Sequence, residues 1–377
     1  MKRHIKPAYA RFDPAHLLDG LFVPTRGKKR ERLYVAPRDF DGVLIGYQGF
    51  EQLGADDQSV LLAIAAQLGI DGDFIGDNPP GPVAQELRSL MDFKIDFKDE
   101  NGQDQEFDRE ELLASRQTTL RSLLIDAGYK EVDGGRALAD MKNILNRLSN
   151  AQIRERSRNG WDRRCNLVSA SFDDQTGKTY IAINPRLTKA VFHGQCVKIS
   201  LFERNVLDGD VAKILHSWLS SNIRPGWALG RGNGARIDTL ATHVWGPAWE
   251  AMPANQKSRK RCQFRDALDQ IKCKTEQLHD GYGWAIDQTS SGMVQVSRPK
   301  RLPLVEIDYG TPACLDKAEM EDFERNSWDE GNSTVGQIGE NYGYGPPHRR
   351  VGRKPASRPK RGKRDPRPNC ESPPSQL

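Results

Sequence analysis

GGRALADMKNILNRLSNAQI occupies residues 134–153, and NLVSASFDDQTGKTYIAIN occupies residues 166–184. In the first segment apolar residues recur at steps of three, four and three, at Leu138, Met141, Leu145 and Leu148, which predicts a helix with one buried face. In the second segment, apolar and polar residues alternate on either side of DDQTGK, which predicts a β-hairpin. TTLRSLLIDAGY, at residues 118–129, precedes both and has a helical period of its own. These segments predict a helix pair followed by a hairpin.

A further helical pattern lies upstream, in LGADDQSVLLAIAAQLGI at residues 53–70. Asp56 or Asp57 is available there as the residue that caps the first helical turn. The residues expected on its buried face are Val60, Leu61, Ile64, Ala65 and Leu68. Three helices followed by a hairpin is the order of elements in a winged helix, so residues 53–190 are expected to form a first winged-helix domain.

The same order recurs in residues 191–301, which are expected to form a second winged-helix domain. The segments that predict its short strands, helices and hairpin are, in order, VKISLF (197–202), DVAKILHSWLSSNI (210–223), RIDTLATHVWG (236–246), NQKSRKRCQFRDALDQIKC (255–273), GYGWAIDQ (281–288) and MVQVSRP (293–299). The residues expected to face its core are Val211, Leu215, Trp218, Leu219, Phe264, Leu268 and Ile271. The two units repeat an architecture and not a sequence.

The expected fold class is therefore α+β, with tandem winged-helix domains, each a helix-turn-helix with a β-hairpin wing. Residues 1–52 are expected to be an N-terminal extension with two strand-like runs, RLYVA (32–36) and GVLIGY (42–47). The acidic stretch at 92–111 predicts an exposed insertion or loop. Residues 302–377 predict a largely disordered tail rich in Gly, Pro and Arg, because apolar residues are too few there to offset the entropy of ordering.

The net charge of +5 comes from the end of the chain. Residues 349–367 contain ten Lys and Arg and one Asp, so the rest of the sequence carries 46 basic and 50 acidic residues, a net charge of −4. The tail would attract any polyanion, or it serves only to keep the protein in solution. The N-terminus lacks the apolar run of a secretory signal, and no stretch reaches the ~18 apolar residues of a membrane span, so a cytoplasmic protein without a membrane partner is expected.

No catalytic or metal-binding constellation is found in the sequence. The six cysteines (Cys165, Cys196, Cys262, Cys273, Cys314 and Cys370) include no CxxC pair, which predicts reduced and mostly buried thiols and no zinc site. The seven histidines stand singly, with His216 and His243 expected at the core, and there is no phosphate-binding loop of the type GxxxxGK[ST]. A protein without catalytic residues or cofactor is expected.

The segment from Lys257 to Lys274 is the strongest candidate for DNA contact. Its cations gather in the first turns of a predicted helix, the part of a recognition helix that enters the major groove. Arg259, Gln263 and Asp266 are expected to point away from the core and toward base edges, and Lys260, Arg261 and Arg265 toward phosphates. The full candidate set in this helix is Lys257, Ser258, Arg259, Lys260, Arg261, Gln263 and Arg265. The alternative is a solvated basic face.

Weaker candidates lie elsewhere. In the helix at 134–153 the residues expected away from Leu138 and Leu145 are Arg136, Lys142, Asn146 and Arg147. In the hairpins, the residues expected as wing contacts to DNA are Lys178, Arg298 and Lys300. The first winged-helix domain could serve self-association as well as DNA binding.

Seven stretches in order give the sequence a resemblance to the replication protein C (RepC) family of IncQ-type plasmids. They are RFDPAHLLDGLF (11–22), LGADDQSVL (53–61), KTYIAINPRLTKAVFHG (178–194), VKISLFERNVLDGDVAKILHSWL (197–219), IDTLATHVWG (237–246), SRKRCQFRDAL (258–268) and VSRPK (296–300). The acidic insertion near 92–111, the GWALGRGNG loop and the sequence beyond Arg301 lie outside the resemblance.

The resemblance implies a non-enzymatic replication initiator that binds directly repeated iterons at a plasmid origin. It also implies opening of an adjacent AT-rich segment and cooperation with a plasmid-encoded helicase and primase. In such initiators the second winged helix makes most base contacts, which carries over to Arg259, Lys260, Arg261 and Arg265. Ser258, Cys262 and Gln263 depart from the more basic family pattern, which suggests a different iteron.

Two other classes remain open from the sequence. A transcriptional regulator with two winged helices, acting on its own gene, would need the same groove chemistry. An enzyme acting on DNA, such as a nickase or primase, would need a catalytic constellation that the sequence does not offer.

Overall fold

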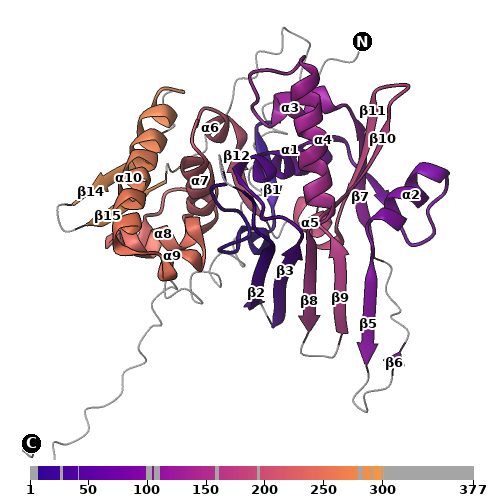
Figure 1. Ribbon diagram of the computed structural model, residues 1–377, viewed down its shortest axis with the longest axis horizontal. Helices are drawn as coiled ribbons and strands as arrows, with labels where there is room; N and C mark the ends of the chain where they lie inside the picture. The colour runs from indigo at the N-terminus through magenta and orange to yellow at the C-terminus, as the bar shows by residue number, and fades with distance from the viewer. Residues whose placement is uncertain are drawn as a thin grey trace, which may run out of the picture. The chain divides into compact units, whose positions relative to one another are not determined.

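A computed structural model describes residues 7–25, 29–40, 42–98, 104–105, 111–157, 161–192, 196–278, 283–289, 292–298 and 300 (Figure 1). All of them lie within one compact body, Met1–Gly345. The tail predicted at 302–377 lies outside the described residues. The structure is a mixture of helices and antiparallel strands, which agrees with the expected α+β class.

The helix predicted at 53–70 forms as α1 (Ala55–Asp71), and its expected apolar face is buried. The prediction that Asp56 or Asp57 is its N-cap was wrong, since Gly54 holds that position. Asp57 lies in the first turn and accepts a hydrogen bond from the backbone N–H of Gly54 at 2.6 Å. A carboxylate at this point also suits the positive end of the helix dipole.

The helix pair and hairpin predicted from residues 118–184 form as a first structural unit around α1. Its further elements are β4 (Asp73–Ile75), α2 (Pro82–Leu90), β7 (Leu113–Thr118), α3 (Leu120–Asp126), α4 (Gly135–Ser149), β10 (Val168–Asp173), β11 (Lys178–Ile183) and α5 (Pro185–Phe192). The strands make one antiparallel sheet in the order β10-β11-β7-β4. The strand before the helix pair, β7, therefore lies beside the second strand of the hairpin.

A six-stranded antiparallel sheet is built from three separate parts of the sequence. In spatial order its strands are β2 (Leu33–Phe40), β3 (Val43–Gly49), β8 (Gln152–Ser157), β9 (Trp161–Asn166), β5 (Lys94–Lys98) and β6 (Asp104–Gln105). The runs RLYVA and GVLIGY form β2 and β3 as predicted. Of the exposed insertion or loop predicted over 92–111, the loop was wrong for Lys94–Lys98, which pairs with β9, and the exposure was wrong for Glu111, which is buried against Arg163.

The elements predicted between residues 197 and 299 also form, and two short helices that were not predicted, Leu201–Asn205 and Ala248–Ala251, join them in a second unit. They are β12 (Val197–Ser200), α6 (Leu201–Asn205), α7 (Asp210–Asn222), β13 (Ala235–Arg236), α8 (Ile237–Trp245), α9 (Ala248–Ala251), α10 (Ala254–Glu276), β14 (Ala285–Gln288) and β15 (Met293–Ser297). The last three strands make a sheet in the order β13-β15-β14. Here too the strand before the helix pair, β13, lies beside the second strand of the hairpin.

The two units are joined by strands far apart in the sequence. β1 (Tyr9–Phe12) pairs antiparallel with β12, and Ala10 and Phe12 are fully buried. A short 3₁₀ turn, Pro14–Leu17, follows β1 and buries His16. The residues expected at the cores are buried, apart from Leu138 and Val211, which are half-buried.

The cysteines only partly follow the prediction of buried thiols. Cys165 is buried and Cys196 is half-buried, but Cys262 and Cys273 are exposed on α10, whereas Cys314 and Cys370 lie outside the described residues. The expectation of mostly buried thiols was therefore wrong for the pair on α10. Over the described ranges, no helix combines the length and the apolar content needed to cross a membrane.

Candidate nucleic-acid interface

α10 has one face in the core and one face in solvent. Phe264, Leu268 and Ile271 are fully buried, and Trp245 of α8 packs against Phe264 with ring centroids 6.2 Å apart. After the exposed first turn, Ala254–Gln256, the exposed residues on the N-terminal half of the helix are Ser258, Arg259, Cys262, Gln263, Arg265 and Asp266. This is the face predicted to point away from the core.

Arg259 and Arg265 are the exposed cations of this face. Neither makes a hydrogen bond or ion pair to any residue that the structure describes. They are six residues apart, which places them about 9 Å apart along the helix axis. Their guanidinium groups are therefore available to a ligand without breaking an existing contact.

Two lysines at the start of α10 lie over tryptophan rings, a contact that was not predicted from the sequence. Lys257 Nζ lies 5.7 Å from the ring centroid of Trp249 and donates to the carbonyl of Glu250 at 3.1 Å. Lys260 Nζ lies 5.3 Å from the ring of Trp245 and donates to Gln263 Oε1 at 2.9 Å. Aromatic support of this kind holds an ammonium group at the rim of the helix. The pair Trp245 and Trp249, four residues apart and shortly before a basic run, is the signal that could have revealed this contact.

Arg261 is committed to a neighbouring helix. Its Nε and Nη2 donate to the two carboxylate oxygens of Asp238, in the first turn of α8, at 2.7 and 2.8 Å. The hydrogen bond from Arg261 holds the pKa of Asp238 below its usual value. Arg261 thus ties α8 to α10. Farther along α10, Lys272 and Lys274 likewise donate to backbone carbonyls, those of Ile286 and Val206.

The N-terminal segment anchors α8 from the other side. Asp19 Oδ1 lies 2.7 Å from Nδ1 of His243, whose ring stacks on Trp218 at 4.1 Å between centroids. Gly246 ends α8 with φ +63°, and a Cβ on it would lie 2.7 Å from the Cα of Gly20. Two of the seven stretches that carry the family resemblance, 11–22 and 237–246, therefore meet here, and their contact holds the helix on which α10 packs.

The candidates on α4 are not one surface. Arg136 and Asn146 are exposed, and Lys142 pairs with Asp174 of the hairpin turn at 2.7 Å. Arg147 instead turns inward, and its Nη2 lies 2.9 Å from Oδ1 of the fully buried Asp57. The prediction of Arg147 as a DNA contact was wrong, because its guanidinium neutralises a carboxylate inside the fold.

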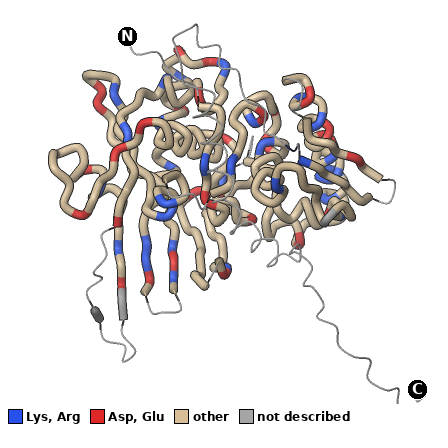
Figure 2. Tube along the Cα trace, turned by 180° about the vertical axis from the view of Figure 1, so that it is seen from behind, with Lys and Arg blue, Asp and Glu red and all other residues tan. Residues whose placement is uncertain are grey.

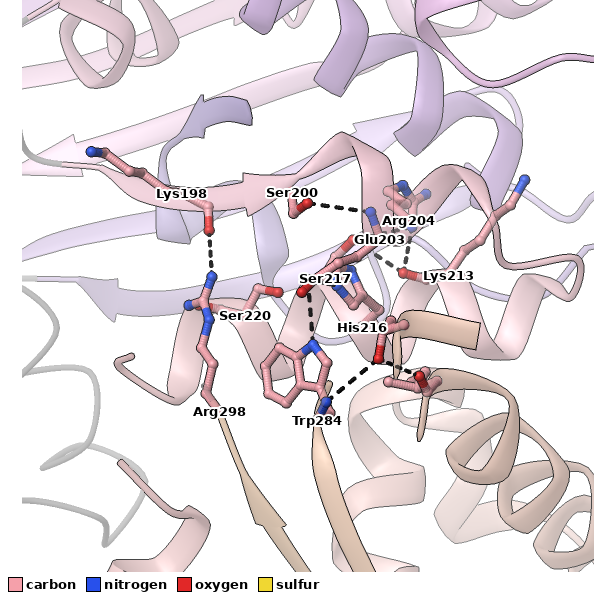
Figure 3. Close-up of polar contacts among 12 residues, drawn as sticks. Lys198, Ser200, Glu203, Arg204, Lys213, His216, Ser217, Ser220, Trp284 and Arg298 are labelled. Atoms are coloured by element: carbon pink, nitrogen blue, oxygen red, sulfur yellow. Dashed lines mark hydrogen bonds and ion pairs between the residues drawn. The ribbon is translucent and has the colours of Figure 1, made fainter. Parts of the chain in front are cut away.

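The hairpin candidates also divide. Lys178 is half-buried at the start of β11, and Lys300 is exposed. Arg298 is buried, and it donates to the carbonyls of Ser220, Ile223 and Lys198 at 2.7, 3.1 and 3.0 Å (Figure 3). The prediction of Arg298 as a wing contact was therefore wrong, since its guanidinium donates hydrogen bonds to backbone carbonyls at the C-terminal end of α7.

A buried polar cluster beside Arg298 links α6, α7 and Trp284 by hydrogen bonds (Figure 3). Glu203 Oε2 accepts from Nε2 of His216 at 2.7 Å and from Nε1 of Trp284 at 3.3 Å. Burial raises the pKa of Glu203, but the hydrogen bond and charge of His216, the charge of Arg298 and the hydrogen bond from Trp284 together outweigh burial and lower this pKa. Burial also lowers the pKa of His216, so the pair is a carboxylate with a neutral imidazole near neutral pH. His216 and His243 are core residues, as predicted.

Arg204 extends this cluster to the first unit. Its Nη2 donates to the carbonyl of Ala55 and to Ser59 Oγ, both at 3.1 Å, and its Nη1 donates to Ser217 Oγ at 3.1 Å. Burial lowers the pKa of Arg204 to about 9. Among the residues that the structure describes, no group of three or more His, Cys, Asp or Glu side chains is arranged to hold a metal ion.

The described part of the chain is thus an α+β protein with two helix-and-hairpin units, the second of which presents an exposed basic helix. The chain belongs to the replication protein C (RepC) family, whose model matches residues 5–300. This confirms the resemblance and makes the chain a plasmid replication protein. A comparison with individually curated proteins found no match.

Proposed function

We propose that this protein initiates plasmid replication by binding directly repeated iterons in duplex DNA, with α10 as the helix that enters the major groove. The connectivity of the second unit supports this, because α7, β13, α8, α10, β14 and β15 follow one another as in a winged helix. The first unit has the same order, α1, β7, α3, α4, β10 and β11. The six-stranded sheet is built from β2 and β3 of the N-terminal extension and from two insertions into this order, β5–β6 and β8–β9. Both units are interpreted as winged helices.

The observation that carries the proposal is the exposed pair Arg259 and Arg265 on the outward face of α10. Arginine can donate two parallel hydrogen bonds to the guanine edge in the major groove. Lys257 and Lys260, at the rim of the same face, suit phosphate contacts, which position a protein without reading sequence. The rest of the proposed role is non-enzymatic. Binding promotes opening of an adjacent AT-rich segment at the origin, where a plasmid helicase and primase then act.

The test is fluorescence anisotropy of the full chain on a duplex carrying the host plasmid's direct repeats and on a shuffled duplex, across salt concentrations. We expect the repeats to bind at least ~10³-fold more tightly. Arg259→Ala should lose about 1–3 kcal/mol on the repeats and relax specificity, whereas Arg265→Ala, which removes an expected phosphate contact, should weaken binding to both duplexes. Lys257→Ala should weaken both duplexes alike and lower the salt slope by about 1.

Arg121→Ala is the matched control, because Arg121 is an exposed arginine on α3 whose partner, Asp133, is also exposed. It should leave both affinities unchanged. Equal binding of the two duplexes by the unmodified protein would rule out sequence reading by α10.

A further inference from the structure

The outer face of the six-stranded sheet is open to solvent along β3, β8, β9 and β5 (Figure 1). The pairing places Arg154 of β8 opposite Arg164 of β9, and Arg164 opposite Lys94 of β5. Side chains directly opposite one another in a sheet are neighbours, and like charges in such positions destabilise the pairing. Three cations in one row across three strands are therefore an unfavourable arrangement unless an anion lies over them.

Within this row of cations, one carboxylate of the protein, that of Asp162, accepts from the arginines. Asp162 accepts hydrogen bonds from Nε of Arg154 at 3.0 and 3.1 Å and from Nη2 of Arg156 at 3.1 Å. Arg164 Nε lies 3.8 Å from Asp162, too far for a hydrogen bond, and has no acceptor among the described residues. Three guanidinium groups thus share one carboxylate, and Arg156 and Arg164 keep donors for a second anionic ligand.

The charge of this face is net positive but modest. Arg154, Arg156, Arg164 and Lys94 are set against three carboxylates. Asp162 and Asp96 lie opposite each other on β9 and β5, and Asp92 pairs with Lys94 at 3.3 Å. Figure 2 shows how Lys and Arg alternate with Asp and Glu along these strands. The opposite face of β8 and β9 is closed, because Glu155 and Arg163 pair with each other inside the fold. The outer face is therefore the one available to a ligand.

Aromatic side chains lie at the β2–β3 edge of the same sheet. Tyr34, opposite Gln48, is 70% exposed, and Phe50, just beyond β3, is 78% exposed. Between them and the arginines lie amides, where Gln48 donates to Gln152 at 3.1 Å. The sheet thus combines solvent-exposed rings, amides and a row of cations.

We infer that this face of the sheet binds single-stranded DNA, with Arg156 and Arg164 on phosphates and Tyr34 stacked on a base. Stacking on an exposed ring needs an unpaired base, and basic grooves with aromatic platforms are how proteins hold single strands. Duplex DNA fits poorly, because β2 to β5 span about 19 Å at ~4.8 Å per strand. The major groove is only about 12 Å wide and admits a two-stranded ribbon. A protein partner also fits poorly, since charged residues are depleted at the centre of protein interfaces.

The test uses the full chain and a fluorescent 20-nucleotide oligo(dT), with the repeat duplex measured in parallel. Arg164→Gln and Tyr34→Ala should each weaken oligo(dT) binding by about 5-fold or more, the range of a lost stacked base or charged contact. Both should leave repeat-duplex affinity unchanged. Arg121→Gln, at an exposed arginine on α3, is the control and should change neither. Loss of both affinities together, or of neither, would overturn the inference.

A second measurement separates this site from the basic tail and from α10. An oligonucleotide carrying 5-iodouracil should photo-cross-link to a peptide that contains Tyr34 or Phe50. Cross-links confined to residues 349–367 or to α10 would contradict the inference. Arg259→Ala should lose repeat specificity and keep oligo(dT) binding, so failure of iteron recognition and failure of the single-strand site give different results.

Discussion

His16 is a fully buried imidazole in an aromatic cage. Its ring centroid lies 5.7 Å from that of Phe12 and 5.9 Å from that of Tyr47, and its Nε2 accepts from Nδ2 of Asn184 at 3.3 Å. Burial lowers the pKa of His16 to about 3, and the charge of Arg186 adds to the effect. A proton cannot enter this cage without cost, so the folded protein holds His16 neutral.

His16 makes stability depend on pH below neutrality. An unfolded histidine has a pKa near 6.5, so between about pH 6.5 and 3 the unfolded chain binds a proton that the folded chain does not. The contribution of His16 to the free energy of unfolding is complete above that range. As the pH decreases through the range, this contribution decreases by up to about 1.4 kcal/mol per pH unit. Urea unfolding at pH 7, 6, 5 and 4 should show this slope, and His16→Phe should flatten it.

Phe12→Leu is the control for that experiment, because it disturbs the same cage and keeps the imidazole. It should lower the free energy of unfolding at every pH and preserve the slope. An unchanged slope in His16→Phe would show that other groups cause the acid sensitivity.

Asp57 joins two helices from inside the fold. Its oxygens accept from the Gly54 N–H at the start of α1, from Arg30 at 2.7 Å and from Arg147 of α4 at 2.9 Å. Arg147→Ala should destabilise the protein by about 1–3 kcal/mol, because it removes one of two cations from a buried carboxylate. Lys142→Ala, on the same helix but paired with the exposed Asp174, should cost less than about 0.5 kcal/mol.

The measurement is urea unfolding of both variants, followed by anisotropy on the repeat duplex under conditions where each is folded. Folded Arg147→Ala should bind like the unmodified protein. Weakened binding without a loss of stability would restore Arg147 as a DNA contact.

Local periodicity predicted the helices and hairpins well, because each pattern depends on neighbours in sequence. α4, α10 and the β10–β11 hairpin lie where their apolar periods indicated. β5 was missed because its alternation, KIDFK, lies in an acidic stretch and its partner β9 is some 65 residues away. The six-stranded sheet could not be predicted for the same reason, since its register is set between distant segments.

The candidate surface was predicted where exposure alone mattered and missed where a distant partner mattered. Arg259 and Arg265 follow from the helical period and the buried Phe264. Arg298 is withdrawn from solvent by carbonyls 75 and more residues away, and Arg147 by a carboxylate 90 residues away. A charge pattern in sequence shows that a cation is present, and only the fold shows whether that cation is already paired.

β1 makes the two units depend on one another. Phe12 is fully buried on a strand that pairs with β12 of the second unit and packs beside α1 of the first. Phe12→Ala should cost about 3–5 kcal/mol, mostly through the cavity left behind. Hydrogen exchange of amides in both α1 and α7 should speed up together.

Leu87→Ala is the comparison, because Leu87 is equally buried but lies on α2, which packs on β10 and β11. It should speed exchange in the first unit more than in α7. If Phe12→Ala changed only one of the two helices, the units would not share a core.

The pairing of β1 with β12 also has a consequence for how the protein is made. Val197, the partner of Phe12 in this pairing, is translated 185 residues after it. At typical rates of synthesis this is a delay of roughly 10–40 s. During that time the edge of β1 has no β12 to pair with, so the nascent chain exposes a strand edge of the kind that chaperones bind and that aggregates if left alone. Because β12 belongs to the second unit, β1 can complete its native pairing only after translation has entered that unit.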